Sequence, residues 1–589
     1  MTTSPAGGGN FADLVREAAS RFGDRPAVIG DGAIRTWAAL NAAADTGAAR
    51  LLESGARRGD RVLVALSTSA DLAAVLIAVA RAGLVAVPID PTRAEPIRVA
   101  RRVQARIGIA ADDTAAGMEI AVGRVDLAGW WSDNRVPVDP IGGGEELALL
   151  ARASRSDRAV MIPHRAVLAA VAAVLRTPGL GLRADDRALL ALPLFHLSGF
   201  VTAFLPLTAV GGAAVIPSDS GLLTAVHEHR VTILPGSPAV YRQLLRADGA
   251  ERALSTVRLM TSGAAPLQPE DFSAAKSLTG QNVWEGYGIS ESTSVVATSM
   301  MTGQARPGSV GLPVAGLELR IVPDDDDLGS EPDPGSEPDA DNEAPTATEP
   351  VDDSLADVES IGEVGQIAIR GPMLFLGYWP DAADGPDDDG WYRTADVGYT
   401  DDHGELHLVD RLDDTFVVAG FTVYPREIER VLADHPYVAE AAVVGLGSER
   451  GTTVVAVITP RPGTHPTDED LAEFLAERLP VFKRPTVFHL TAELPRTELG
   501  RVDRRAALQV YADVSETSGA PAGSPALTPV DAAPPADTDE KPAAAVDPQF
   551  IPEAAADLDQ LGRRLPSVGS RGVRGTQDDD DDLFGEDFN

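Results

Sequence analysis

Strand-like and helix-like patterns alternate along the chain from Asn10 to about residue 320, and this alternation constrains the fold more than any other feature. Phe11–Phe22 has the spacing of an amphipathic helix, and Leu72–Arg81 is an apolar helical run. The short β-rich runs Arg61–Leu66 and Leu84–Pro88 flank the second helix. Repeated strand–helix–strand units place helices over the faces of parallel sheets. The pattern therefore predicts a large α/β domain.

Leu189–Pro217 carries no Asp, Glu, Lys or Arg, and it is long enough to mimic a transmembrane helix. However, Pro193, Gly199, Pro206 and the pair that begins at Gly211 interrupt it. A buried strand–loop–helix–strand path through an α/β core is therefore the better interpretation, and we expect no transmembrane segment.

The formal net charge of −38 is concentrated in two segments. Residues 324–360 hold 15 acidic residues and no Lys or Arg, and residues 512–589 hold 17 acidic and 5 basic residues. Neither segment has enough large apolar residues to offset the entropy of ordering, so we predict a disordered insertion at 323–360 and a disordered tail at 512–589. The acidity argues against binding to nucleic acids or to anionic membranes, which requires clusters of Lys and Arg.

The end of the tail combines an acidic run with Leu583, Phe584 and Phe588. This composition resembles a short docking peptide, and residues 552–589 are a candidate site for a protein partner. A solvated tail that only improves solubility explains the same composition.

Cysteine is absent from the chain, which excludes disulfides, thiolate metal sites and a cysteine nucleophile. The first residues show no basic region followed by an apolar run, so no secretory signal is predicted. Both features fit a reducing cytoplasm, where we expect the protein to be located.

Eight short motifs follow one another in the second half of the α/β pattern and beyond it. They are Leu192–Gly199, Ser262–Leu267, Glu285–Glu291, Arg306–Gly311, Trp391–Asp396, Asp410–Asp414, Val423–Glu429 and Leu494–Arg501. In this order they resemble the motifs of the adenylate-forming (AMP-binding) superfamily, and in particular those of acyl-CoA synthetases such as the fatty acid–CoA ligases. The resemblance covers about residues 8–510, and eight motifs in sequence make a chance match negligible.

Members of this superfamily join a carboxylic acid to ATP with release of pyrophosphate, and then transfer the acyl group to a thiol, usually that of CoA. The resemblance therefore implies ATP, Mg²⁺ and CoA as cofactors and co-substrates, and a small-molecule carboxylic acid as substrate. Such chemistry requires the α-phosphate to lie in line with the carboxylate. It also requires charge on the phosphates to be neutralised by amides, a cation and a metal ion.

The resemblance implies a role for each matching residue on the nucleotide side. Asp396 matches the carboxylate that accepts hydrogen bonds from both ribose hydroxyls, a task that suits an acceptor-only group. Tyr287 matches the ring that stacks on adenine, and Glu291 matches the magnesium ligand. Ser290 replaces the usual threonine and keeps its hydroxyl. The full set predicted for the nucleotide is Gly263, Ala264, Glu285, Gly286, Tyr287, Gly288, Ser290, Asp396 and Arg411.

Other matches lie beside the hinge and the thiol. Arg411 matches a residue that reaches ribose or phosphate, and Asp413 matches the hinge about which the C-terminal domain rotates between half-reactions. Gly420 matches the glycine that lets this domain approach the thiol channel, and His196 matches the side chain between that channel and the carboxylate pocket. The residues predicted to be catalytic are Arg501, Glu291 and His196.

The phosphate loop departs from the family pattern. Counted back from the following motif, it comprises residues 150–159 and contains no glycine. Arg152, Arg155 and Ala159 stand where family members have glycine, and Asp157 adds a negative charge. A loop that wraps phosphates needs the backbone freedom of glycine, so the pre-organised amide cradle is expected to be lost. The residues still available to phosphate are Ser154, Ser156 and Arg158, the last in place of the loop lysine.

The second departure is Arg501, which stands where the family has the lysine that bridges the carboxylate and the α-phosphate. Arginine keeps the charge, but its planar fork is larger and is directed differently. Both departures affect the first half-reaction, so adenylation is expected to be impaired.

Three functions remain open from the sequence. The first is an acyl- or aryl-CoA ligase with an arginine-based phosphate loop. The second is a pseudoenzyme that binds an adenosine or CoA-type ligand and docks a partner through its acidic tail. The third is an adenylation domain that feeds a separate carrier protein.

The resemblance and the alternation together predict the domains. An N-terminal AMP-binding domain at 8–410 is expected to contain parallel sheets with helices and a small distorted barrel. A mobile α+β lid at 411–511 is expected to close over it, with the active site at the interface. The disordered tail follows at 512–589.

Overall fold

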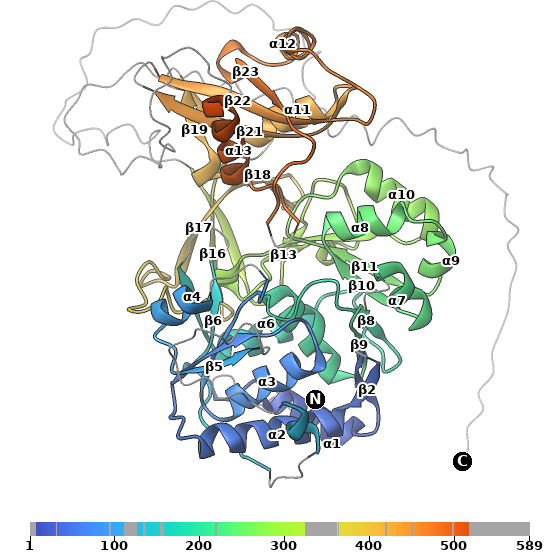
Figure 1. The fold of residues 1–589 in the computed structure, drawn as a ribbon, viewed down its shortest axis with the longest axis vertical. Helices are drawn as coiled ribbons and strands as arrows, with labels where there is room; N and C mark the ends of the chain where they lie inside the picture. The colour runs from blue at the N-terminus through green and yellow to red at the C-terminus, as the bar shows by residue number, and fades with distance from the viewer. Residues whose placement is uncertain are drawn as a thin grey trace, which may run out of the picture. The chain divides into compact units, whose positions relative to one another are not determined.

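The computed structural model describes residues 8–30, 32–92, 96–110, 127–132, 137–153, 158–217, 221–323, 362, 364–418, 421–448, 451–497 and 500–517 (Figure 1). The predicted acidic insertion after its first residue, the predicted tail from residue 518 with its partner segment 552–589, and Ser154, Ser156 and Gly420 lie outside these ranges. The tail was predicted to begin too early, because residues 512–517 continue the last helix. No helix in the described ranges is both long enough and apolar enough to span a membrane.

Two sheets form the N-terminal part, as the alternating pattern predicts. The first has the strand order β5-β3-β4-β6-β7, in which all neighbours are parallel except β6 and β7. Its strands are β3 (Arg61–Ala65), β4 (Val85–Pro88), β5 (Ile107–Ala110), β6 (Leu147–Arg152) and β7 (Ala159–Pro163).

The second sheet has the order β14-β13-β12-β11-β10-β8-β9-β1-β2. It is parallel from β12 to β1 and antiparallel at both edges. Its strands are β1 (Pro26–Gly30), β2 (Ala33–Thr36), β8 (Arg187–Leu189), β9 (Ala213–Val215), β10 (Ile233–Gly236), β11 (Leu259–Ser262), β12 (Val283–Tyr287), β13 (Ala297–Thr298) and β14 (Leu312–Pro313).

Helices cover these sheets. They are α1 (Asp13–Phe22), α2 (Trp37–Glu53), α3 (Ala70–Arg81), α4 (Pro96–Arg102), α5 (Leu127–Ser132), α6 (His164–Leu175), α7 (Leu222–Glu228), α8 (Pro238–Leu245), α9 (Ala250–Leu254) and α10 (Pro269–Thr279). Two of these helices have an N-terminal side-chain cap. The side chains of Thr36 and Ser69 each accept a hydrogen bond from a backbone N–H in the first turn of α2 and α3, respectively. Helices α7 to α10 lie together over one side of the second sheet (Figure 1).

An antiparallel sheet with the order β15-β16-β17-β18 follows, in the region where the small barrel is expected. Its strands are β15 (Glu318–Val322), β16 (Gly365–Arg370), β17 (Trp391–Thr400) and β18 (Leu406–Arg411). Strand β18 leads into the short 3-10 helix η7 (Leu412–Asp414), which contains the predicted hinge residue Asp413.

The C-terminal part has its own sheet and its own buried clusters. The hairpin β19 (Phe416–Val418) and β20 (Phe421–Val423) precedes a sheet with the order β21-β22-β23. Its other elements are α11 (Pro425–Ala433), β21 (Val438–Ser448), β22 (Gly451–Pro460), α12 (Asp468–Ala476), the 3-10 helix η8 (Val481–Lys483), β23 (Val487–Leu490) and α13 (Arg504–Thr517).

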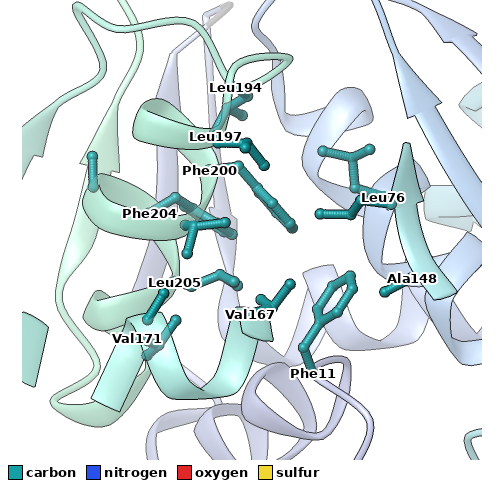
Figure 2. Close-up of a cluster of buried hydrophobic side chains, with 14 of the residues drawn as sticks. Phe11, Leu76, Ala148, Val167, Val171, Leu194, Leu197, Phe200, Phe204 and Leu205 are labelled. Carbon is teal, nitrogen blue, oxygen red and sulfur yellow. The ribbon is translucent and has the colours of Figure 1, made fainter. Parts of the chain in front are cut away.

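The apolar run Leu189–Pro217 lies in the core between the sheets. Strand β8 ends at Leu189, the π-helix η1 (Ser198–Phe204) and the 3-10 helix η2 (Leu205–Ala209) follow, and β9 completes the path. Figure 2 shows Phe200 and Phe204 of η1 in one cluster with Phe11 and with Val167 and Val171 of α6. The rings of Phe200 and Phe11 meet edge to face, 5.7 Å between centroids. The expected buried path is therefore confirmed, but the π-helix was not predicted.

The connection between β6 and β7 is shorter than the phosphate loop predicted at residues 150–159. Its first three residues, up to Arg152, continue β6, and its last residue, Ala159, begins β7. Arg152 and Ala159 are cross-strand partners in the β6–β7 hairpin. The connection is therefore limited to residues 153–158, because the sheet uses the apolar residues at both ends of the predicted loop.

Candidate functional site

Asp396 lies at the centre of a buried polar cluster between β12, β17 and β18. Strand register sets Asp396 opposite Arg411, and the Arg411 Nε lies 2.7 Å from Asp396 Oδ1. The Tyr287 hydroxyl donates to the other oxygen, Oδ2, at 2.7 Å. Burial, together with the Asp396 carboxylate, raises the pKa of Tyr287, so the phenol stays a donor. Three residues that the sequence assigns to the nucleotide are thus brought together.

Of the two glycines beside Tyr287, only Gly288 is required by close packing within the protein. A Cβ on Gly288 would lie 1.6 Å from the carbonyl oxygen of Ser294, so no other residue fits there. The neighbouring Gly286 is less crowded, since the nearest atom to an added Cβ is 3.4 Å away.

The loop after β11 has two unusual features. Ala264 adopts a left-handed backbone conformation, with φ of +71°. The buried hydroxyl of Ser262 has no hydrogen-bond partner within the described part of the chain. Left-handed non-glycine residues often occur at functional sites, and a buried hydroxyl without a protein partner can accept or donate a further hydrogen bond. Both features lie within the predicted adenine-side loop Ser262–Leu267.

Glu285 is engaged by the protein backbone. Its Oε2 accepts from Leu267 N at 3.0 Å and its Oε1 accepts from Gly308 N at 3.4 Å. Burial raises the pKa of Glu285 to about 7. The side chain therefore ties the predicted adenine-side loop to the loop that follows Arg306.

Glu291, the predicted magnesium ligand, is 7% exposed and lies in the 3-10 helix η3 (Ser290–Ser292). Its Oε1 accepts from the Tyr378 hydroxyl at 2.7 Å. Burial raises the pKa of this carboxyl. The described residues contain no group of three or more His, Asp or Glu side chains that would hold a metal alone. A single carboxylate fits Mg²⁺, which usually takes one or two protein carboxylates together with substrate phosphates and water.

Arg152, which directly precedes the phosphate connection, and Arg158, its last residue, contact neighbouring side chains of the candidate site. Ser290 Oγ donates to the carbonyl oxygen of Arg152 at 3.0 Å. The Arg158 guanidinium lies 4.0 Å above the Tyr378 ring and 2.6 Å from Asp384 Oδ2. The predicted loop cation is therefore held by side chains of the segment after β16.

His196 precedes η1, where its Nδ1 accepts the backbone N–H of Ser198 at 3.2 Å. Burial lowers the pKa of His196 to about 4, so the ring is neutral near pH 7. With Nδ1 accepting, the proton of the neutral ring is on Nε2. A Cβ on Gly199 would lie 2.1 Å from the Pro193 carbonyl oxygen, which explains the glycine in this motif.

Asp413 is exposed, but an ion-pair cluster surrounds its helix. Arg504 of α13 contacts both Glu429 oxygens at 2.7 and 2.6 Å, Asp414 Oδ2 at 2.7 Å and Asp410 Oδ1 at 3.2 Å. Asp410 is 2% exposed and also accepts the backbone N–H of Arg426 at 2.7 Å. Asp410 thus joins β18 to α11 and α13.

The last predicted catalytic residue, Arg501, lies in a closed turn. Thr497 N donates to the Arg501 carbonyl oxygen at 2.8 Å, and Arg501 N donates to Thr497 Oγ1 at 3.2 Å. Gly500 has a φ of +78°, a conformation that favours glycine.

Sequence reasoning missed Tyr378, Tyr392 and the unsatisfied hydroxyl of Ser262. Tyr392 and Ser262 lie within the motifs Trp391–Asp396 and Ser262–Leu267, so their place in these motifs is the signal that marks them. Tyr378 lies between motifs and 87 positions from Glu291, so no local pattern marks it.

Comparison with known proteins identifies the family. The model for the AMP-binding enzyme matches residues 15–117 and 158–379, and the model for the AMP-binding enzyme C-terminal domain matches 427–501. The interval between the first two ranges includes most of the aberrant phosphate loop.

Curated relatives are CoA ligases. The long-chain-fatty-acid–CoA ligase of Escherichia coli O157:H7 is 26% identical over 554 residues, covering 84% of this chain and 93% of the relative. The 4-coumarate–CoA ligase 1 of Oryza sativa subsp. japonica is 31% identical over 367 residues, covering 59% of each protein.

Solved structures share the fold. ATP-bound MatB from Rhodopseudomonas palustris has a TM-score of 0.72 at 24% identity, covering 85% of this chain and 99% of that one. The anthranilate CoA ligase AuaEII in complex with anthranoyl-AMP has a TM-score of 0.71 at 22% identity, covering 87% and 99%. Since the family model matches more than half of the chain, this protein belongs to the AMP-binding enzyme family of the adenylate-forming superfamily.

Proposed function

We propose that the chain is an acyl-CoA synthetase-type ligase with slow adenylation. It takes a carboxylic acid, ATP with Mg²⁺, and CoA. The observation that carries the proposal is the buried Asp396–Tyr287–Arg411 cluster, which retains the predicted nucleotide residues in one place. We place the protein in the cytoplasm as part of the same proposal.

In the first half-reaction the acid's carboxylate oxygen attacks the α-phosphorus of ATP, and pyrophosphate leaves. Asp396 accepts the ribose hydroxyls, since each oxygen has a lone pair beyond the contact it already makes. Glu291 would hold the Mg²⁺, which would supply positive charge toward the phosphates. In the second half-reaction the CoA sulfur attacks the acyl carbon and AMP leaves. His196, neutral near pH 7, would add no fixed charge beside the acyl group.

The slow step is assigned to the phosphate side. The connection from Ala153 to Arg158 contains no glycine in its sequence. The cation at the catalytic position is Arg501 instead of lysine. A displaced catalytic contact of about 1 Å can cost on the order of 100-fold in rate.

ATP–pyrophosphate exchange with a panel of fatty and aryl acids tests this proposal. We expect weak exchange by the unaltered protein with at least one acid, and an increase of roughly 10- to 100-fold for Arg501→Lys. Arg430→Lys, on the exposed side of α11, is the matched control and should change nothing. Equal exchange by the Arg501→Lys variant and the unaltered protein would refute the assignment of the slow step.

The second candidate is a pseudoenzyme that binds an adenosine or CoA-type ligand without turnover. The observation that favours it is the engagement of Arg158, the residue in place of the loop lysine, by Asp384 and Tyr378. Binding of AMP without exchange in either the unaltered protein or Arg501→Lys would select it. Exchange that leads to acyl transfer only with an added carrier protein would select the third function, a separate adenylation domain.

A further inference from the structure

The segment from Phe375 to Trp379 joins the phosphate side of the candidate site to Glu291. Three backbone hydrogen bonds of 2.9–3.0 Å pair it with strand β7, which directly follows the phosphate connection. A fourth runs from Phe375 N to the carbonyl oxygen of Glu291 at 2.9 Å. The backbone therefore fixes this segment against both elements.

Tyr378, within this segment, makes contacts through both its ring and its hydroxyl. Its ring packs edge to face on Phe375, with centroids 5.1 Å apart, and carries the Arg158 guanidinium on a face at 4.0 Å. Its hydroxyl lies 2.7 Å from Glu291 Oε1 and 3.1 Å from the Tyr392 hydroxyl. One side chain therefore contacts both the predicted loop cation and the predicted metal ligand.

The hydroxyl defines the orientation of Glu291. A phenol has one proton, so Tyr378 anchors one carboxylate oxygen and leaves acceptor capacity for a cation on the group. A hydrogen bond to an ionised, buried carboxylate is among the stronger kinds. Groups that orient a metal-binding carboxylate in this way strongly affect the affinity for the metal.

We propose that Tyr378 is a positioning residue that holds the Glu291 carboxylate for the metal ion of a metal–ATP complex, with Arg158 on its ring linking it to the phosphate side. This inference rests on the proposed function, because it requires the nucleotide site.

A double-mutant cycle in the ligand-free protein tests the contact itself. Tyr378→Phe should lower the thermal midpoint in the wild-type background, and should lower it less in a Glu291→Gln background, because the neutral amide oxygen of glutamine is a weaker acceptor than a carboxylate. Tyr437→Phe, 45% exposed on the C-terminal part, is the matched control and should be additive with Glu291→Gln. Additive effects of Tyr378→Phe and Glu291→Gln would overturn the proposal whether or not the protein binds nucleotides.

Calorimetric titration tests the role toward the metal. Mn²⁺·ATP, ATP in EDTA, and AMP are titrated into the wild type and Tyr378→Phe. We expect Tyr378→Phe to weaken Mn²⁺·ATP binding about 10-fold or more, and to leave AMP and metal-free ATP within about 2-fold. Tyr392→Phe should show a smaller effect with the same selectivity, because its hydroxyl acts through Tyr378.

Each result is decisive. An equal loss for all three ligands would mean that Tyr378 is only structural, and no loss for Mn²⁺·ATP would mean that it does not position Glu291. Failure of the wild type to bind AMP or ATP would refute the proposed function and the role of Tyr378 toward the metal. The double-mutant cycle would still test the hydrogen bond between Tyr378 and Glu291, because it needs no nucleotide.

Discussion

Glu285 shows how one side chain organises two loops of the candidate site. Its carboxyl accepts the backbone N–H groups of Leu267 and Gly308, from loops more than 40 positions apart. Burial opposes ionisation and raises the pKa of Glu285 to about 7 from an ordinary value of 4.5. The cost of holding this carboxylate buried therefore appears as a pH dependence of stability.

The sign of that dependence follows from proton binding. Between about pH 4.5 and 7 the folded protein keeps the proton on Glu285 and the unfolded chain releases it. The contribution of Glu285 to stability is therefore greatest below pH 4.5 and is lost as pH rises through 7, by on the order of 3 kcal/mol. Glu285→Gln should remove this slope, measured as the difference between urea unfolding curves of the variant and the wild type.

The stability of Glu285→Gln must be compared with that of the wild type at each pH, because the titration of His164 changes stability in the opposite direction. Burial lowers the pKa of His164 to about 4, so its contribution is present above pH 6.5 and is lost as pH falls through 4. That contribution cancels in the comparison. Glu251→Gln, on the exposed face of α9, should keep the wild-type slope. If Glu285→Gln also keeps it, Glu285 does not titrate in this window.

At the same scale, the sequence predicts residues that carry local motifs and misses those that act through space. Asp396, Tyr287 and Arg411 were predicted for one ligand, and they are in contact. Tyr378 was not predicted, because its partners Arg158 and Glu291 reach it only through the pairing of its segment with β7. A contact between residues so far apart in the sequence cannot be predicted from the spacing of motifs.

Secondary-structure elements were predictable where the periodic pattern was long. The expected helix Leu72–Arg81 is part of α3, and the expected strand Arg61–Leu66 is β3 to within one residue. The π-helix η1 was not predictable, because its short apolar sequence fits several backbone conformations equally well. The phosphate connection was predicted too long, because strand pairing takes both of its ends.

The Arg504 cluster gives a prediction for the elements β18, α11 and α13. Arg504→Met would leave Glu429, Asp414 and the buried Asp410 without their shared cation. Breaking a buried ion pair from one side typically costs about 3–5 kcal/mol, so we expect a loss of this size for the C-terminal part. Urea unfolding followed by hydrogen exchange in α13 measures it.

An exposed pair provides the control for that variant. Arg370 and Glu318 are 40% and 60% exposed, and Arg370→Met should cost at most about 1 kcal/mol. A loss for Arg504→Met no larger than this control would mean that solvent already screens the cluster.

Among the described residues, the large α/β part and the C-terminal part have separate buried clusters, and on this basis we propose a domain boundary near residue 410. The cluster formed by Phe416, Ile428, Leu432 and their neighbours contains only residues from 416 to 488. A second cluster packs on the other face of the β21–β22 pair and draws on α13 through Ala507. Neither cluster includes a residue of the sheets that precede β19.

A fragment of residues 409–517 should therefore fold by itself. It retains both clusters, the long β21–β22 pairing and the Asp410–Arg504 contact, and its length of about 100 residues lies in the usual range for a domain. We expect one cooperative urea transition with a slope of about 1–3 kcal/mol per molar, followed by circular dichroism. Ile428→Asp, at a fully buried position of α11, should abolish that transition, because it places a charge in the centre of the first cluster. A fragment that loses signal gradually, as Ile428→Asp should, would mean that this core needs the large part to form. The boundary at 410 would then divide one cooperative unit instead of separating two.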